Sequence, residues 1–310
     1  MQKSRKTCIS AYNGSLINQI IIMINTDKPV SRFASLMNRL KFNTPSPRLR
    51  QASPLMRWRR RGASSYLEEI KYSRDIRPDD LLCIDRQKTS LRLNTEQFIN
   101  NYPANNVLLW GPRGTGKSSL VKAIFSEYRE RGLYLVEVTR DNLIDLSDIC
   151  DELNQYAGKF IIYCDDLSFD VNDPSYKTLK VLLDGSVSDI PDNILIYATS
   201  NRRHLIPEFR SENLEAEIID GEIHQSEAVE EKLSLSERFG IWLSFHPFNQ
   251  EQYLQIAFHW LARTGVKVGD REQVRQAALQ WALEKGTRSG RSAAQFARNW
   301  AGMTLLADNG

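Results

Sequence analysis

The chain has 310 residues, of which 41% are hydrophobic and 25% charged, a composition typical of a globular protein that can bury a sizeable core. Its four cysteines and four histidines are scattered along the sequence, which argues against a disulfide framework and against a Cys/His metal cluster. The formal net charge of +3 is unevenly distributed, because residues 1–67 carry thirteen Lys and Arg and one acid, Asp27, whereas acids outnumber bases in the rest.

Residues 1–75 are predicted to form a basic, poorly ordered N-terminal arm and linker, with one short amphipathic helix at residues 32–41. An apolar run at residues 16–24 is shorter than the ~20 residues that a membrane helix needs. No signal-peptide cleavage site follows this run. We therefore expect no membrane span and a cytoplasmic location, with an organellar transit peptide as the alternative.

The basic residues 1–64 indicate a partner of their own, either nucleic acid or a protein client. A solvated tail without a partner is equally compatible with this composition. Within the segment, the stretch RWRRRG at 57–62 combines Trp58 with four arginines, which could grip phosphates while the indole stacks on a base. The alternative, which we favour, is that this stretch lies against an acidic surface of the protein's own body.

From residue 76 onward, short apolar runs rich in β-forming residues alternate with helical patterns. The predicted strands are at 107–110, 133–138, 160–164, 194–198 and 241–245, and the helices between them at 117–131, 141–156, 174–184 and 225–239. This alternation predicts an α/β domain at residues 76–246, built on a five-stranded parallel sheet flanked by helices. Three later helical stretches predict a small helical domain at residues 247–310; they are at 249–264, 270–285 and 291–303.

The first predicted strand of the α/β domain leads into a glycine-rich loop that matches GxxxxGK[ST] and is followed by a helix, the context that a phosphate-binding loop requires. Gly114 and Gly116 permit backbone angles that turn successive N–H groups onto phosphate oxygens, and the helix N-terminus adds its positive dipole end. The Lys117 ammonium would neutralise the β- and γ-phosphates, and the Ser118 hydroxyl could ligand Mg²⁺. The residues predicted to bind the nucleotide are Gly111, Pro112, Arg113, Gly114, Thr115, Gly116, Lys117, Ser118 and Ser119.

Two adjacent carboxylates, Asp165 and Asp166, follow the apolar strand 160–164. A phosphate-binding loop needs a carboxylate at the tip of a neighbouring strand to hold Mg²⁺, and Asp165 is placed for that role. Asp166 is then the candidate for orienting and deprotonating the attacking water. The alternative is that Asp166 only caps a turn with Ser168.

The next predicted strand ends in ILIYATSNRRH, which places a polar side chain near the γ-phosphate of a bound nucleotide. Asn201 is the candidate for sensing that phosphate, and Thr199 and Ser200 are nearby alternatives. A purely structural alternative is that Asn201 begins a turn.

These segments resemble the AAA+ ATPases over roughly residues 78–303. The resemblance rests on GPRGTGKS (Walker A), IIYCDD (Walker B), IYATSN (sensor 1), SERFG before a fifth strand, and the helical lid. More narrowly, DDLLCIDRQ, YCDDLSFD, DPSYKTLKVLLDGS, YATSNRRHLIPE and SGRSAAQFARNW are similar to a bacterial family of predicted AAA+ ATPases of unknown function. The resemblance implies a P-loop NTPase fold, ATP as the nucleotide and Mg²⁺ as the metal.

The resemblance also implies roles for residues outside the loop. Arg238 matches an arginine finger supplied to the ATP of a neighbouring subunit, which implies a homo-oligomer; the alternative is a surface partner of an acid on its own helix. Arg291 matches the sensor 2 position, with Arg288 as the alternative. Leu82 and Ile84 match the segment that surrounds the adenine.

One departure from the AAA+ pattern concerns the pair Asp165-Asp166, where most such proteins have Asp-Glu. The shorter Asp166 reaches about one methylene less far, so that another acid, Asp170 or Asp173, could contribute. Two functions are therefore expected: an ATPase that remodels or loads a macromolecule, or an ATP-responsive switch with little hydrolysis. A small-molecule kinase or a GTPase ranks last, because the sequence contains no [NT]KxD guanine motif.

Overall fold

The computed structural model describes residues 53–62, 64–71, 76–169, 173–184, 190–203, 205, 217–219, 222–224, 235–266 and 269–308. The chain separates into two compact units, Met1–Gln51 and Ala52–Gly310, and all the described residues belong to the second. The predicted helix at 32–41 and most of the predicted helix at 225–239 lie outside the described residues.

A mostly parallel sheet of seven strands forms the centre of the second unit, in the order β2-β1-β4-β5-β6-β3-β9. The five predicted strands are confirmed, and they lie side by side and parallel as β4 (Leu133–Val138), β5 (Lys159–Cys164), β6 (Ile194–Ser200), β3 (Val107–Trp110) and β9 (Ile241–Ser244). The two additional strands are β1 (Leu55–Arg61) and β2 (Ser64–Glu69). A separate two-stranded sheet pairs β7 (Glu217–Ile219) with β8 (Glu222–His224).

Strands β1 and β2 correct the prediction of a linker that continues to residue 75. They form an antiparallel hairpin, and β1 pairs in parallel with β4, so that the sheet begins at Leu55. The alternation in β1 explains this, because Met56 and Trp58 are 1% and 3% exposed while arginines occupy the positions between and after them. The Pro, Ser and Arg composition of the region conceals this two-residue period.

The arginines of β1 contact the protein's own body, as the favoured interpretation of RWRRRG predicts. Arg57 pairs with Glu137 of β4 at 2.5 Å, and Arg60 lies 3.4 Å from Asp145. The Trp58 indole N–H donates to the same Asp145 carboxylate at 3.1 Å. These acids anchor the hairpin to the sheet and to the segment after β4.

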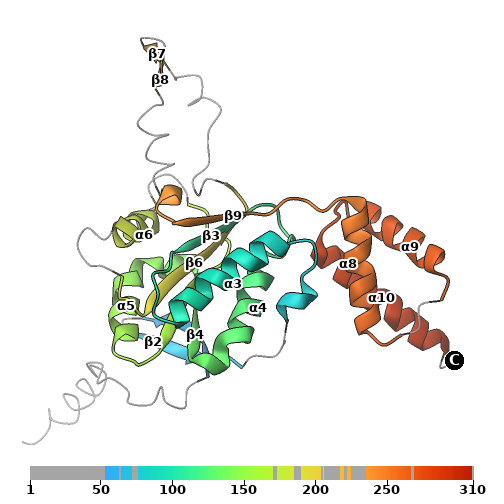
Figure 1. Cartoon of the computed structure of the whole chain (residues 1–310), viewed down its shortest axis with the longest axis horizontal. Helices are drawn as coiled ribbons and strands as arrows, with labels where there is room; N and C mark the ends of the chain where they lie inside the picture. The colour runs from blue at the N-terminus through green and yellow to red at the C-terminus, as the bar shows by residue number, and fades with distance from the viewer. Residues whose placement is uncertain are drawn as a thin grey trace, which may run out of the picture. The chain divides into compact units, whose positions relative to one another are not determined.

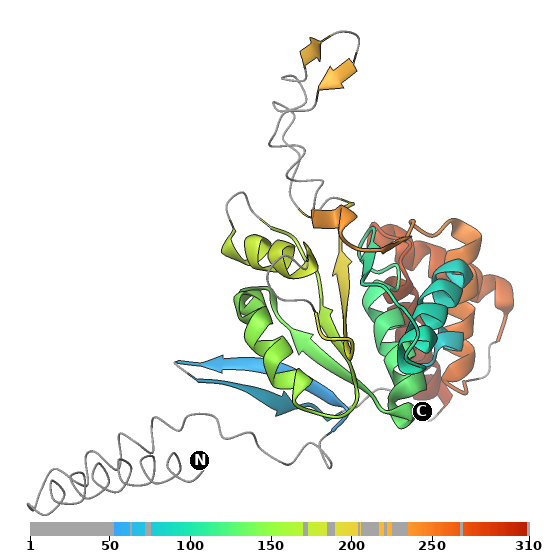
Figure 2. The ribbon, with the colours of Figure 1, turned by 60° about the vertical axis from the view of Figure 1, so that its left-hand side comes forward.

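Helices cover both faces of the sheet (Figures 1 and 2). On one face lie α3 (Asp85–Ile99) and α4 (Lys117–Tyr128), and on the other α5 (Leu146–Asn154) and α6 (Pro174–Asp184). Helix α3 is not predicted from the sequence, because polar Asn94 and Thr95 share its buried face and weaken the apolar period. The predicted helix at 141–156 is a 3₁₀ segment, Arg140–Asp145, followed by α5.

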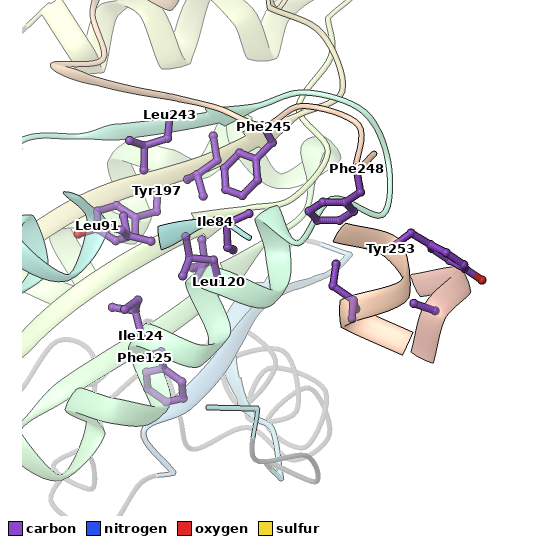
Figure 3. Close-up of a cluster of buried hydrophobic side chains, with 14 of the residues drawn as sticks. Ile84, Leu91, Leu120, Ile124, Phe125, Tyr197, Leu243, Phe245, Phe248 and Tyr253 are labelled. Carbon is purple, nitrogen blue, oxygen red and sulfur yellow. The ribbon is translucent and has the colours of Figure 1, made fainter. Parts of the chain in front are cut away.

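The main core lies between the sheet and the layer of α3 and α4. Leu91, Leu120, Ile124, Tyr197 and Leu243 are buried together there (Figure 3). Burying one such side chain contributes roughly 1.5–3 kcal/mol, so this layer fixes α4 firmly against the strands. As a result, the start of α4 has a defined position relative to the carboxyl ends of β5 and β6.

The C-terminal helices form the predicted lid, as α8 (Gln250–Arg263), α9 (Arg271–Glu284) and α10 (Gly290–Asp308). Asn249 caps α8, since its side chain accepts from the Gln252 N–H at 2.9 Å while the Gln252 side chain accepts from the Asn249 N–H. Phe248 and Tyr253 continue the core cluster from the sheet into the lid (Figure 3). No helix among the described residues is both long and apolar enough to cross a membrane.

Candidate nucleotide-binding site

A cavity of about 840 Å³ lies at the carboxyl ends of β3, β5 and β6, where the sheet, the segment 76–84 and the lid meet. Its lining includes residues 113–119 of the glycine-rich loop. Seven further residues singled out from the sequence also line it: Leu82, Ile84, Asp165, Asp166, Thr199, Asn201 and Arg291. Residues that are far apart in the chain are thus brought to one site.

The backbone of the glycine-rich loop has the conformation that a phosphate cradle requires. Gly114 and Gly116 have φ angles of 78° and 103°, and α4 begins directly after Gly116. A Cβ atom on Gly114 would lie 2.7 Å from the Ser289 Cβ, so the loop also depends on glycine for its contact with the lid. The arrangement directs the N-terminal N–H groups of α4, with its positive dipole end, into the cavity.

Lys117 is a buried cation whose acceptors are all neutral oxygens. Lys117 is only 6% exposed. Its Nζ donates to the carbonyl oxygens of Gly111 at 2.6 Å and Pro112 at 2.8 Å, and to Asn201 Oδ1 at 3.2 Å. Burial lowers the pKa of Lys117, and the negative charges of Asp166 and Asp165 oppose that shift. An anion such as a phosphate would compensate this buried charge.

Asp165 is surrounded by hydroxyl groups. Its Oδ1 accepts from Ser118 Oγ at 2.7 Å and from Thr199 Oγ1 at 2.6 Å. Burial by itself raises the pKa of Asp165, but the hydrogen bonds from Thr199 and Ser118, helped by the nearby Tyr163 hydroxyl, outweigh it and lower the pKa below its usual value. An ionised carboxylate beside a serine hydroxyl is a suitable pair of hard oxygen ligands for Mg²⁺.

Asp166 leaves the strand in a left-handed conformation with φ of 55°. Its backbone N–H donates to Thr199 Oγ1 at 2.9 Å, and its carboxylate accepts from Asn201 Nδ2 on one oxygen and from Arg113 Nη2, at 3.2 Å, on the other. Asn201 therefore joins Lys117 to Asp166. The hydroxyl of Thr199, named above as an alternative to Asn201, donates to the Asp165 carboxylate and does not contact Lys117 among the hydrogen bonds described.

The apolar end of the cavity contains the predicted Leu82 and Ile84 together with aromatic and aliphatic side chains that no motif indicates. Trp260 and Ile256 of α8 and Phe248 also line it. The sequence pattern of α8 predicts only an amphipathic helix, so it contains no signal that these residues face a ligand. The apolar and aromatic character of these side chains fits a nucleobase.

Asp80 joins the segment before α3 to the lid at this apolar end. Its buried carboxylate pairs with Arg263 of α8, accepts from the Arg77 N–H at 3.0 Å and lies 3.6 Å from His259 Nε2. Burial raises the pKa of Asp80, whereas hydrogen bonds from Arg77 and Arg263 lower it, and the net effect is a lowered pKa. The Asp80–Arg263 pair was not predicted, since no role was inferred for Asp80 within the stretch DDLLCIDRQ and Arg263 belongs to no motif.

Two other candidates, Arg238 and Asp173, do not line the cavity. Arg238, just before β9, pairs with Asp184 at the end of α6. Asp173 pairs with Arg140 at 2.5 Å, and Asp170 lies outside the described residues. Of the two lid arginines, Arg291 lines the cavity, near the point where the Gly290 N–H donates to the Gly114 carbonyl at 2.8 Å.

Comparison with known proteins identifies one family and several solved structures of similar fold. A family described as "Protein of unknown function (DUF815)" matches residues 51–304. None of the curated proteins matches the chain.

Among solved structures, Thermotoga maritima RuvB, named as a Holliday junction branch migration motor, is 15% identical with a TM-score of 0.51, over 75% of this chain and 66% of that chain. A variant of the same RuvB is 16% identical with a TM-score of 0.51, over 73% of this chain and 63% of that chain. Aeropyrum pernix ORC1, solved in complex with DNA, is 15% identical with a TM-score of 0.51, over 76% of this chain and 62% of that chain. The chain thus spans less than two thirds of each of these proteins, and at such identities the likeness concerns the fold.

Proposed function

This chain belongs to the family described as "Protein of unknown function (DUF815)" and has the fold of the AAA+ ATPases, and on that basis we propose that it binds ATP and hydrolyses it with Mg²⁺. The energy of that cycle would remodel or load a macromolecule. The observation that carries the proposal is the environment of Lys117. Its buried ammonium is held by three neutral oxygens and lies at the N-terminus of α4, beside the Ser118–Asp165 pair. This positive charge complements the negative charge of a polyphosphate whose Mg²⁺ would be held by Ser118 and Asp165.

Ser118 and Asp165 are the residues that would hold Mg²⁺. When bound, the metal neutralises charge that develops on the β- and γ-phosphate oxygens during phosphoryl transfer. The protein's part is to keep Asp165 ionised, which the lowered pKa of this carboxyl achieves. The loop backbone between Arg113 and Lys117 would hold the phosphates, and the apolar end of the cavity would hold the base.

Asp166 and Asn201 are the groups that would handle the attacking water. Asn201 Nδ2 donates to the Asp166 carboxylate, and Asn201 Oδ1 accepts from Lys117 Nζ. Because Asn201 is held at both ends, it gives the Asp166 carboxylate a defined orientation. Asp166 would accept the proton of a water that attacks the γ-phosphorus, as a general base. Arg291, on the lid side of the cavity, would contact the γ-phosphate and report its presence to the lid.

A second candidate function is an ATP-responsive switch that hydrolyses slowly. The observation in its favour is that both carboxylate oxygens of Asp166 already accept hydrogen bonds, from Asn201 and Arg113. A base engaged on both oxygens accepts a proton from water less readily. The two functions differ in turnover and share the nucleotide-binding site.

We also propose a homo-oligomer in which Arg238 reaches the ATP of a neighbouring subunit. Arg238 is separate from the cavity of its own chain and pairs with Asp184, so any contact with a phosphate would be made in trans. Nucleic acid is the first class of client to test. Residues 1–51 carry most of the basic excess, and the compared folds include a branch migration motor and a protein solved with DNA.

The test is a titration of the full chain with ATP, in Mg²⁺, alongside phosphate release and light scattering with and without nucleic acid. Wild-type protein should bind ATP, assemble in its presence and release phosphate. Lys117→Ala should weaken ATP binding by about 100-fold, because it removes a buried charge-assisted hydrogen-bond donor. Lys285→Ala is the matched control, since this lysine lies over the Trp281 ring of the lid and outside the cavity. Equal ATP affinity of both variants would refute the proposal, and binding with negligible phosphate release would favour the switch.

A further inference from the structure

Tyr163 of β5 has a polar group that the fold buries without satisfying it. Its side chain is 0% exposed, and within the described part of the chain its hydroxyl has no hydrogen bond of good geometry. Alternation along the strand places Tyr163 on the same side as Asp165, two residues later. Its hydroxyl faces the side chains of Asp165, Ser118 and Thr199.

The neighbouring strand shows how the same fold satisfies a buried tyrosine. Tyr197 of β6 is the register partner of Tyr163 and is equally buried. Its hydroxyl bonds to Thr95 Oγ1 at 2.8 Å and accepts from Asn94 Nδ2 at 3.1 Å. A buried hydroxyl that lacks such partners destabilises the folded state, and phenylalanine would fill the same space without that cost. The Tyr163 hydroxyl therefore has no evident use in the fold itself.

The metal-facing carboxylate offers that hydroxyl a use. Both hydrogen bonds to Asp165 from Ser118 and Thr199 reach one oxygen, Oδ1. A cation held by Ser118 and Asp165 would draw the serine oxygen and the carboxylate toward itself, which changes the first of these bonds. The Tyr163 hydroxyl, buried on the same side of the strand and without a partner among the described residues, is then available as a donor in addition to Thr199.

We propose that Tyr163 is a positioning residue for Asp165, whose hydroxyl donates to the Asp165 carboxylate when a divalent cation occupies the site. The bond would hold the carboxylate in the orientation that the cation requires. This inference rests on the proposed function, because it assumes that Ser118 and Asp165 hold the metal. It adds a residue that acts through Asp165 and touches neither the nucleotide nor the cation.

The test compares Tyr163→Phe with wild type in two conditions. In EDTA without nucleotide, the midpoint of thermal unfolding should be unchanged or up to about 4 °C higher, because an unsatisfied hydroxyl is removed. With ATP present, the Mg²⁺ concentration for half-maximal enhancement of ATP binding should rise about tenfold, since a charge-assisted hydrogen bond is lost. ATP affinity in EDTA should not change.

Tyr197→Phe is the matched control. It removes a hydroxyl that is bonded to Thr95 and Asn94, so its unfolding midpoint should fall by about 2–4 °C while the Mg²⁺ requirement stays that of wild type. A second check uses Asp165→Asn: adding Tyr163→Phe to it should cause no further change in the Mg²⁺ requirement, because Tyr163 acts through the carboxylate.

The inference is overturned if Tyr163→Phe lowers the unfolding midpoint as Tyr197→Phe does and leaves the Mg²⁺ requirement unchanged. That result would leave the proposed function intact, provided that wild type binds ATP more tightly with Mg²⁺. If Mg²⁺ does not enhance ATP binding by wild type, both the metal site and the role of Tyr163 are refuted.

Discussion

Asp165 and Asp166 are adjacent in the chain but have different environments. Asp165 continues the direction of Tyr163 in β5, so its side chain points to α4 and accepts from Ser118. Asp166 turns out of the strand with φ of 55°, which leaves its carboxylate half-exposed at the cavity, against Asn201. One backbone angle thus separates a carboxylate suited to a metal from one suited to water.

Asp166→Asn should lower the rate of phosphate release by about 10²- to 10⁴-fold and leave ATP binding close to that of wild type, because an amide cannot accept the proton of water. Single-turnover phosphate release and an ATP titration measure the two quantities. Asp173→Asn is the matched control, since Asp173 binds Arg140 instead of lining the cavity. If Asp173→Asn slows release and Asp166→Asn does not, the general base has been misassigned.

At the scale of elements, the lid is attached to the sheet domain on both sides of the cavity. On the phosphate side, the Gly290 N–H that begins α10 donates to the Gly114 carbonyl at 2.8 Å. On the base side, Asp80 pairs with Arg263 of α8. These contacts join the lid directly to the segments that would hold ATP, so we expect nucleotide binding and lid position to be coupled.

Gly114→Ala should abolish ATP binding, because the new methyl group would meet Ser289 at 2.7 Å and the backbone has φ of 78°. Gly132→Ala is a control for the backbone effect alone, since Gly132 has φ of 84° but no atom within 4 Å of the added Cβ. Both variants should lose about 1–2 kcal/mol of stability from the left-handed backbone, but Gly132→Ala should bind ATP normally. An ATP titration and urea unfolding of both variants provide the comparison.

The Asp80–Arg263 contact should make stability depend on acid pH. Since the pKa of Asp80 is lowered below its ordinary value of 3.8, its contribution is present above that pH and is lost as the pH falls through the lowered value. At pH 7, Asp80→Asn should be less stable than wild type by about 1–3 kcal/mol, and this difference should shrink below pH 3.8. Urea unfolding at stepped pH measures it. Asp79→Asn, at the exposed neighbouring acid, should show no such gap.

At the scale of the whole molecule, Arg238 tests whether the site is completed by another subunit. Arg238→Ala should lower phosphate release by about 10³-fold and preserve ATP binding. Mixing this variant with Lys117→Ala should restore part of the activity, because some assembled subunits would then combine an intact site with an intact arginine. Asp184→Asn removes one partner of Arg238 within the chain and should leave release unimpaired. No recovery on mixing would contradict action in trans.

The boundary of the folded body lies before β1, which changes how the basic arm should be removed. A variant without residues 1–51 should unfold at the temperature of wild type and bind ATP equally well. A variant without residues 1–64 also loses β1 with its buried Met56 and Trp58, which should cost about 3–5 kcal/mol of stability. Equal unfolding midpoints of the two variants would show that the hairpin is dispensable.

The shorter truncation also tests the nucleic-acid client. If residues 1–51 bind DNA or RNA through phosphate contacts, binding by the full chain should weaken steeply between 50 and 200 mM salt. The variant without these residues should then lose that binding and retain ATP affinity. If the variant binds nucleic acid as tightly as the full chain does, the contact belongs to residues 52–310.

The amino-acid sequence alone was enough to predict the glycine-rich loop before α4, the strand that ends at Asp165 and Asp166, and the five parallel strands. Each of these is a local pattern: glycines at turns, or an apolar run of one strand's length followed by polar residues. Because parallel strands place their carboxyl ends at one edge of the sheet, these patterns also predicted that Asn201 would lie near the γ-phosphate of a bound nucleotide; its contact with Asp166 came from the structure. The composition of residues 55–69 led to the wrong prediction of a linker. Arginines and serines dominate this hairpin, and only Met56 and Trp58 in it are buried.

Only the tertiary structure decided which distant side chains meet. It paired Asp80 with Arg263 and Arg238 with Asp184, and it placed the Tyr163 hydroxyl beneath the Asp165 carboxylate. The physical reason is that such contacts depend on how helices pack against the sheet, which buried area determines, whereas periodicity in the sequence records only which face of an element is apolar. Most of the polar residues that line the cavity could therefore be predicted one by one, while their connections to the lid and to the core could not.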